Sequence, residues 1–235
     1  MMMTLIINPP VMLDDFPLML HTRQKLEMIL SGTIKFPEQK KGLLLYGTYG
    51  TGKTTMAELL PGWIETAKTT SSWKNRPIGE LVDAAQPNYN LHPCAQGQNG
   101  VTLIGRIQAQ TSHMSFNSTG LHYIILDELD LLTEAASASL KAIMNRTDIA
   151  FILTTNHLNK VDRGVQDRCI LIDMNAPPPT EWLNKIHTIY QASGLTPPSN
   201  HAITSIVQAG NGSARNILTD TQIAEEKRQG NLQNA

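Results

Sequence analysis

Short apolar runs alternate with stretches of helical spacing along the first three quarters of the chain. Runs typical of buried parallel strands lie at 42–46, 122–127, 149–154 and 169–173. Helical spacing predicts helices at 16–30, 53–66, 101–110 and 135–145, and one more strand is expected near 89–92. Strands that alternate with helices predict an α/β fold with a parallel sheet sandwiched by helices. Such sheets bind ligands at the carboxyl ends of their strands.

The same pattern predicts core positions and one helix break. The core candidates in the first helix are Leu18, Leu20, Leu26, Ile29 and Leu30. In the helix near 135–145 they are Leu140, Ile143 and Met144. Pro61-Gly62 is expected to kink the 53–66 helix or to end it early, because proline lacks the N–H that helix interiors need.

The pattern changes after Asn175. A rigid Ala176-Pro-Pro-Pro-Thr180 segment is followed by helical stretches near 180–192, 200–209 and 213–228. We therefore predict two domains, an α/β domain over residues 1–175 and a small helical domain over residues 176–235.

Composition limits the partners. The net charge of −1 gives no bulk electrostatic argument for nucleic acid or for an anionic membrane. Cys94 and Cys169 stand far apart and outside metal-ligand spacing, which favours buried thiols in a reducing compartment. The short apolar start has no basic region, and no apolar run approaches the ~18 residues of a membrane span. We expect a cytoplasmic protein without membrane contact.

A phosphate-binding loop follows the first buried strand. The segment Gly47-Thr48-Tyr49-Gly50-Thr51-Gly52-Lys53-Thr54 fits G-x-x-x-x-G-K-[ST] in full, and Thr55 follows it. Its glycines allow successive N–H groups to face phosphate oxygens, and the next helix adds its positive dipole end. Lys53 is expected to reach the β- and γ-phosphates of ATP. Thr54 is expected to offer its hydroxyl to Mg²⁺.

Two acids end the strand at 122–127. Asp127 is expected to hold Mg²⁺, mostly through water. Glu128 is expected to orient and polarise the attacking water. This order of acids disfavours a small-molecule kinase of the same loop class, which needs no water-activating glutamate.

From these acids onward the chain resembles AAA+ clamp-loader small subunits, of the replication factor C or bacterial loader type. The resemblance covers roughly residues 18–223, with a poor match at 68–98. It rests on five segments: residues 21–55, Asp127-Glu-Leu-Asp-Leu-Leu-Thr133 with the helix to Lys141, Phe151–Asn156, Asp-Arg-Cys169, and Gly212-Ser-Ala-Arg215.

The resemblance implies roles for further polar residues. Asn156 would be the sensor 1 residue that holds the attacking water or touches the γ-phosphate. Arg215 would be sensor 2 and would reach the phosphates from the helical domain. Arg168 would be an arginine finger acting in trans on a neighbouring subunit, with Arg163 as the rival candidate. A homo- or hetero-oligomer is therefore expected to hydrolyse ATP better than one subunit alone.

The chain departs from the family pattern in four places. The N-terminal signature is missing, so residues 11–16 are expected to line the adenine pocket instead. Ser137 replaces a glutamine that links DNA binding to the catalytic glutamate in the family. The bacterial zinc-binding cysteines are absent. The chain ends at Ala235, before the helical collar of clamp loaders, so assembly is expected to use the ATPase faces, a partner or DNA.

The implied function is an ATP-hydrolysing switch that assembles on DNA and loads a partner protein. Helicase-loader or transposition-regulator activity, or a nucleotide-dependent scaffold with little hydrolysis, remain alternatives. A third option is Holliday-junction or protein-remodelling activity, although threading of a polypeptide is disfavoured because no aromatic pore-loop motif is evident. A local basic patch for DNA is expected from Lys74, Arg76, Arg106, Lys141 and Arg146.

Overall fold

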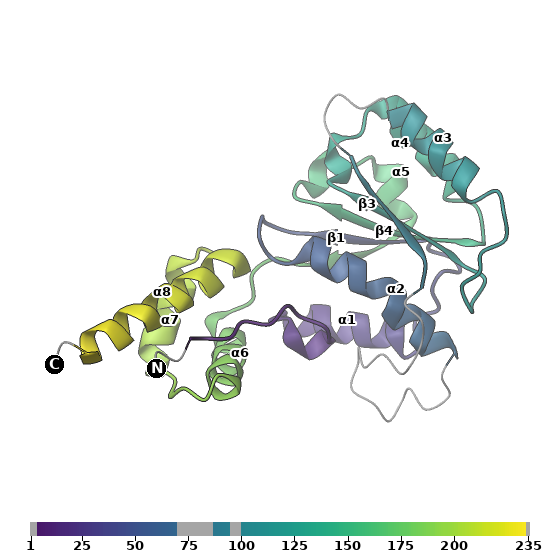
Figure 1. The fold of residues 1–235 in the computed structure, drawn as a ribbon. Coiled ribbons are helices and arrows are strands. Elements are labelled where there is room, and N and C mark those ends of the chain that lie inside the picture. The colour runs from purple at the N-terminus through teal and green to yellow at the C-terminus, as the bar shows by residue number, and fades with distance from the viewer. Residues whose placement is uncertain (1–3, 70–86, 95–99, 234–235) are drawn as a thin grey trace.

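A computed structural model describes residues 4–69, 87–94 and 100–233 of the chain. Its centre is a five-stranded parallel sheet with the strand order β2-β3-β4-β1-β5 (Figure 1). The strands are β1 (Gly42–Tyr46), β2 (Tyr89–Pro93), β3 (His122–Asp127), β4 (Ile149–Thr155) and β5 (Cys169–Asp173). The predicted parallel α/β sheet is therefore confirmed.

Helices cover both faces of the sheet. One face packs against α1 (Leu20–Leu30) and α2 (Lys53–Thr69) through side chains such as Leu43 and Leu45 of β1. The other face packs against α3 (Gly100–Gln110), α4 (Glu134–Ile143) and the short α5 (Arg163–Asp167). Leu44 belongs to this second core, because successive side chains of a strand point to opposite faces. The two helical layers lie above and below the sheet in Figure 1.

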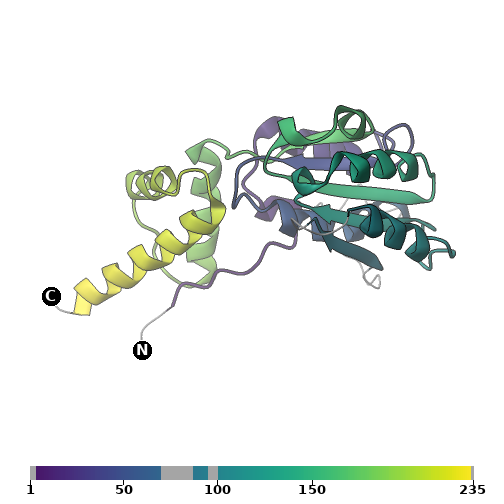
Figure 2. The ribbon, with the colours of Figure 1, turned by 90° about the horizontal axis from the view of Figure 1, so that it is seen from above.

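Three further helices form a separate group with its own core. They are α6 (Pro179–Ala192), α7 (Asn200–Ala209) and α8 (Ala214–Gln233), and they bury Trp182, Ile186 and Ile203 among other side chains. Figure 2 shows α8 extending away from the sheet layers. The N-terminal segment joins this group, because Leu5 is buried in its core and the N–H of Ile6 donates to Ser193 Oγ at 2.8 Å.

Short 3-10 helices complete the described elements. They are η1 (Leu13–Asp15), η3 (Leu129–Leu131) and η4 (Leu158–Lys160). Among the described helices none combines the length and apolar character that crossing a membrane requires.

Two predictions about the helices were wrong. Helix α1 begins at Leu20, not at 16, because Pro17 fixes an extended segment there; Leu20 is 67% exposed and is not a core residue. The other predicted core residues of this segment are buried. Helix α2 continues through Pro61-Gly62 to Thr69, so the expected early end is wrong, whereas the kink stays a prediction. The full burial of Leu60 and Trp63 on either side of Pro61-Gly62 explains why packing outweighs the lost helical hydrogen bond.

A close approach of β1 and β5 requires a glycine. A Cβ atom added at Gly42 would lie 2.6 Å from Cys169 Sγ and 3.1 Å from Met144 Cε.

Both cysteines, Cys94 and Cys169, are buried, and burial raises the pKa of each thiol to about 12, as expected for inert core thiols.

Candidate functional site

The glycine-rich loop joins β1 to α2 at the carboxyl edge of the sheet. Gly50 and Gly52 have φ angles of +75° and +88°, which residues with side chains rarely adopt. Helix α2 begins at Lys53, so its first N–H groups and its positive dipole end face the hollow of the loop. This is the backbone arrangement that binds phosphate oxygens.

Lys53 is buried against the loop that precedes it. Its ammonium donates to the carbonyl oxygens of Gly47 at 2.9 Å and Thr48 at 2.6 Å, and its residue is only 7% exposed. Burial lowers the pKa of Lys53 to about 8, while Asp127 and two further acids oppose this shift. A charged ammonium in this place favours an anionic ligand, because an added phosphate charge would stabilise its protonated form.

Asp127 faces the first turn of α2. Its Oδ1 accepts hydrogen bonds from Thr54 Oγ1 at 3.0 Å and from Thr154 Oγ1 at 2.5 Å. The sheet order explains this proximity, because β3 is separated from β1 only by β4, which carries Thr154. A hydroxyl and a carboxylate side by side are the oxygen ligands that Mg²⁺ prefers.

Glu128 is held in an unusual backbone conformation. It has φ 59° and ψ 51°, and among the described non-glycine residues only Asn211 also has a positive φ. The conformation costs about 1 kcal/mol or more. Its N–H donates to Thr154 Oγ1 at 3.1 Å, so the hydroxyl of Thr154 serves both acids. Glu128 is therefore exposed to solvent at the edge of the cavity beside the loop.

The predicted residues meet around one cavity of about 210 Å³. Its lining comprises Tyr49–Thr55 of the loop, Asp127, Glu128, Thr154, Asn156 and Arg215. Asn156 follows β4, and Arg215 lies in the first turn of α8. The N–H of Arg215 donates to Gly50 O at 3.4 Å, so the C-terminal helices contact the loop directly.

A second cavity of about 210 Å³ adjoins the first and is more apolar. It shares Gly50–Gly52, Thr55 and Arg215 with the first cavity and adds residues of the N-terminal segment and of α6, including Phe16, Trp182 and Lys185. Its size and apolar walls suit a planar base. Of residues 11–16, which we expect to line the adenine pocket, Asp15 and Phe16 line this cavity. Val11 is 55% exposed and lies outside its lining.

Arg168 lies at the opposite edge of the sheet from the loop. It directly precedes β5, whose first residue pairs with Gly42 at the start of β1, whereas the loop follows the end of β1. Its guanidinium donates to Gly164 O at 2.9 Å and to Asn145 Oδ1 at 3.4 Å. Arg163 instead lines a depression of about 670 Å³, whose lining also includes Thr48 and Asn156.

Two of the three described cations that were predicted to bind DNA form ion pairs. Lys141 pairs with Asp162 at 3.0 Å, and Arg146 pairs with Asp148 and also donates to Thr111. Arg106 is exposed. The two remaining candidates, Lys74 and Arg76, lie outside the described residues. The expected patch is therefore not supported at Lys141 and Arg146, whose charges are balanced by carboxylates.

Sequence reasoning missed several residues that shape the site. Besides Thr154, they are His157, whose Nε2 lies 2.9 Å from Tyr49 Oη of the loop, and Asn175, whose Oδ1 accepts the N–H of Thr48 at 3.1 Å. The Thr154-Thr155-Asn156 run at a strand end was a signal for hydroxyls near the acids. The other contacts join segments more than 100 residues apart, and no local pattern predicts them.

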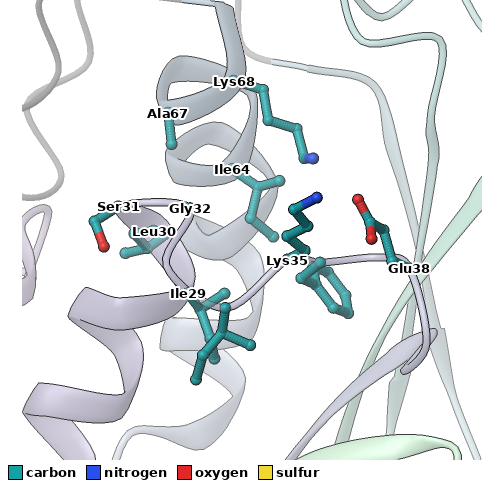
Figure 3. A pocket seen from close by; sticks show the side chains of 11 residues that line it. Ile29, Leu30, Ser31, Gly32, Lys35, Glu38, Ile64, Ala67 and Lys68 are labelled. Atoms are coloured by element: carbon teal, nitrogen blue, oxygen red, sulfur yellow. The ribbon is translucent and has the colours of Figure 1, made fainter.

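A cavity of about 230 Å³ lies between α1, α2 and the segment 31–38, away from these residues (Figure 3). Its floor is apolar, with Ile29, Leu30 and Ile64, and Lys35, Glu38 and Lys68 stand around it. It contains none of the predicted site residues. In the described part of the chain, no three His, Cys, Asp or Glu side chains gather into a metal site of their own.

Comparison with known proteins confirms the fold and the resemblance to clamp-loader subunits. No family model matches the sequence. The chain is 26% identical over 185 residues to replication factor C small subunit 2 of Pyrobaculum islandicum, covering 77% of this chain and 52% of that protein. It is 27% identical over 194 residues to replication factor C subunit 3 of Oryza sativa subsp. japonica, covering 79% and 49%. The chain thus spans about half the length of these relatives.

Among solved structures, the fold matches the RuvB Holliday junction branch migration motor of Thermotoga maritima. The TM-score is 0.65 at 17% identity, over 91% of this chain and 64% of that chain. At this identity the match concerns the fold alone. Together with the sheet and its loop, it shows that the chain has the α/β fold of AAA+ P-loop ATPases.

Proposed function

We propose that this clamp-loader-like AAA+ chain binds and hydrolyses ATP and acts in DNA replication or another DNA transaction, by ATP-dependent assembly or loading of partners. The observation that carries this proposal is the convergence of Lys53, Asp127, Glu128, Asn156 and Arg215 on one cavity beside the glycine-rich loop. The similarity to replication factor C subunits supports the setting in DNA replication.

Each side chain has a task that its position supports. The loop N–H groups and Lys53 would bind the β- and γ-phosphates, and Phe16 would border the base. Thr54 and Asp127 fit Mg²⁺ by the chemistry of their oxygens, and the ion would neutralise phosphate charge when bound. Glu128 would orient a water and accept its proton, because it is the exposed carboxylate at the cavity mouth.

The two arginines act from different sides. Arg215 would bind the phosphates within the same subunit, since α8 already contacts Gly50. Arg168 lies too far from its own loop to serve it, which supports the proposed role in trans on a neighbouring subunit. We further propose that residues 1–175 form the nucleotide-binding domain and that residues 176–235 form a lid carrying Arg215. The working form is an oligomer in the cytoplasm, with DNA and a loaded protein as partners.

Turnover and binding measured together test the proposal. Glu128→Gln should bind Mg–ATP as tightly as wild type while its phosphate release falls at least about 100-fold, because the water loses its base. Glu134→Gln is the matched control, since Glu134 is an exposed acid in the first turn of α4. Wild-type turnover in Glu128→Gln would contradict the catalytic assignment. Tight binding with negligible turnover in the wild type would favour the scaffold alternative.

A further inference from the structure

Both backbone polar groups of Thr48 are held in place. Its carbonyl oxygen accepts from Lys53 Nζ at 2.6 Å and from Thr51 Oγ1 at 3.1 Å. Its N–H donates to Asn175 Oδ1 at 3.1 Å. The first contacts lie within the loop, whereas Asn175 follows β5, far along the chain. The start of the loop is thus fixed from outside the glycine-rich motif.

The side chain of Asn175 is itself oriented by an acid. Its N–H and Nδ2 both donate to Asp173 Oδ1, at 2.9 and 2.8 Å. A carboxylate only accepts, so the amide nitrogen must face Asp173 and the amide oxygen must face Thr48. Asp173 is the last residue of β5 and pairs in register with Tyr46, directly before the loop. The sheet therefore supplies a rigid base for this contact.

Backbone packing leaves little room for the contact to slip. A Cβ atom at Gly47 would lie 2.6 to 2.8 Å from backbone atoms of Met174 and Asn175. Asn175 is also the last residue before the proline-rich segment that leads to α6. In that segment, Ala176 packs beside Gly212, just ahead of Arg215. One residue thus touches the start of the phosphate loop and the start of the connection to the C-terminal helices.

We propose that Asn175 is a positioning residue that fixes the backbone of Thr48, and with it the position of Lys53 in the nucleotide-free protein. Through this contact Asn175 couples the shape of the phosphate loop to the segment entering the C-terminal helices. The inference rests on the proposed function, because it concerns the same phosphate site. Without Asn175, the backbone of Thr48 gains conformational freedom, and this freedom must be lost again when phosphate binds. Since ATP and ADP share the phosphates next to the loop, the loss should affect the affinity for both.

Nucleotide affinity and kcat distinguish this role from a general structural one. Asn175→Ala should weaken the binding of fluorescent ATP and ADP analogues by about 3- to 10-fold, the range expected for one net hydrogen bond. The kcat at saturation should change less than about twofold, because the lost contact is shared by ground state and transition state. Asn159→Ala is the matched control, since Asn159 lines the same depression and is exposed. It should bind like wild type. Unchanged affinity in Asn175→Ala, or equal weakening in the control, would overturn the inference.

An exchange of the two partners supplies a rescue. Asn175→Asp keeps an acceptor for Thr48 but places two carboxylates together and removes the donor to Asp173. The double variant Asp173→Asn/Asn175→Asp restores one amide and one carboxylate, with the amide donating in the opposite direction. It should recover affinity to within about twofold of wild type, in line with one restored hydrogen bond. A double variant no better than Asn175→Asp would count against the positioning role.

Amide exchange of Thr48 tests the contact without nucleotide. In nucleotide-free protein the Thr48 N–H should exchange about 10-fold faster in Asn175→Ala than in wild type, because its acceptor is gone. Equal exchange rates in the two proteins would overturn the inference, even if the wild type is found to bind ATP in a separate assay. If the wild type binds neither nucleotide while exchange still depends on Asn175, the proposed function fails and the positioning of the loop stands.

Discussion

The charge of Lys53 should destabilise the nucleotide-free protein, so a substitution that removes this charge should raise the free energy of unfolding. A pKa of about 8, against the ordinary value of 10.5, means that the folded state holds the charged ammonium less well than the unfolded state. At pH 7 this difference in pKa lowers the free energy of unfolding by about 3 kcal/mol relative to an uncharged side chain. Lys53→Met keeps most of the length of the side chain and removes the charge. The two hydrogen bonds of Lys53 to loop carbonyls are also lost, so the net gain in stability should be about 1–3 kcal/mol.

The pH dependence isolates the charge from the hydrogen bonds. Because the folded pKa is depressed, the cost is fully present below about pH 8 and shrinks as the pH rises toward 10.5. Between pH 7 and pH 9 the advantage of Lys53→Met should fall by about 1 kcal/mol, since the wild-type lysine loses its proton in the folded state first. Contributions of other titrating groups cancel in the comparison of the two proteins.

Urea unfolding without nucleotide, at pH 7 and pH 9, measures both quantities. Mg–ATP should then raise the midpoint of the wild type and leave that of Lys53→Met unchanged, because the variant lacks the ammonium that binds the phosphates. The reasoning would be refuted by a Lys53→Met protein that is no more stable than wild type at pH 7 and whose difference from wild type does not change with pH.

Three further substitutions test the site and the fold. Thr154→Val keeps nearly the same side-chain shape but removes the hydroxyl that donates to Asp127 and accepts from the N–H of Glu128. The kcat should fall about 10-fold in steady-state turnover, while the ATP affinity in equilibrium binding should stay within about twofold of wild type. Gly42→Ala should lower the free energy of unfolding by about 1–3 kcal/mol in chemical denaturation, because its Cβ meets Cys169 Sγ at 2.6 Å. Gly105→Ala, where nothing lies within 4 Å of the added Cβ, should instead stabilise α3 by about 0.5–1 kcal/mol.

The strands and the phosphate loop could be predicted because their signals are local. The apolar run at Gly42–Tyr46 and the motif that follows it need only neighbouring residues to be recognised. Helix ends were less certain. The position of Leu20 depended on where the extended segment at Pro17 ends, and α2 passes Pro61 because tertiary packing stabilises it.

The residues missed by sequence reasoning depend on the sheet order. Thr154 serves Asp127 because β4 lies between β3 and β1. Asn175 reaches Thr48 because β5 lies on the other side of β1. A single sequence gives strands in chain order and not in spatial order, so these contacts were outside its reach. The ion pairs of Lys141 with Asp162 and of Arg146 with Asp148 were missed because the charge of a residue does not by itself reveal its partner.

The most direct test of the central claim is phosphate release by the purified chain with Mg–ATP, measured over a series of protein concentrations. The proposed site with Arg168 acting in trans predicts ATP turnover whose rate per subunit rises with concentration. Equimolar Glu128→Gln and Arg168→Ala subunits should together release more phosphate than either alone. A chain that releases no phosphate at any concentration would contradict the assignment of Lys53, Asp127 and Glu128 to an ATPase site.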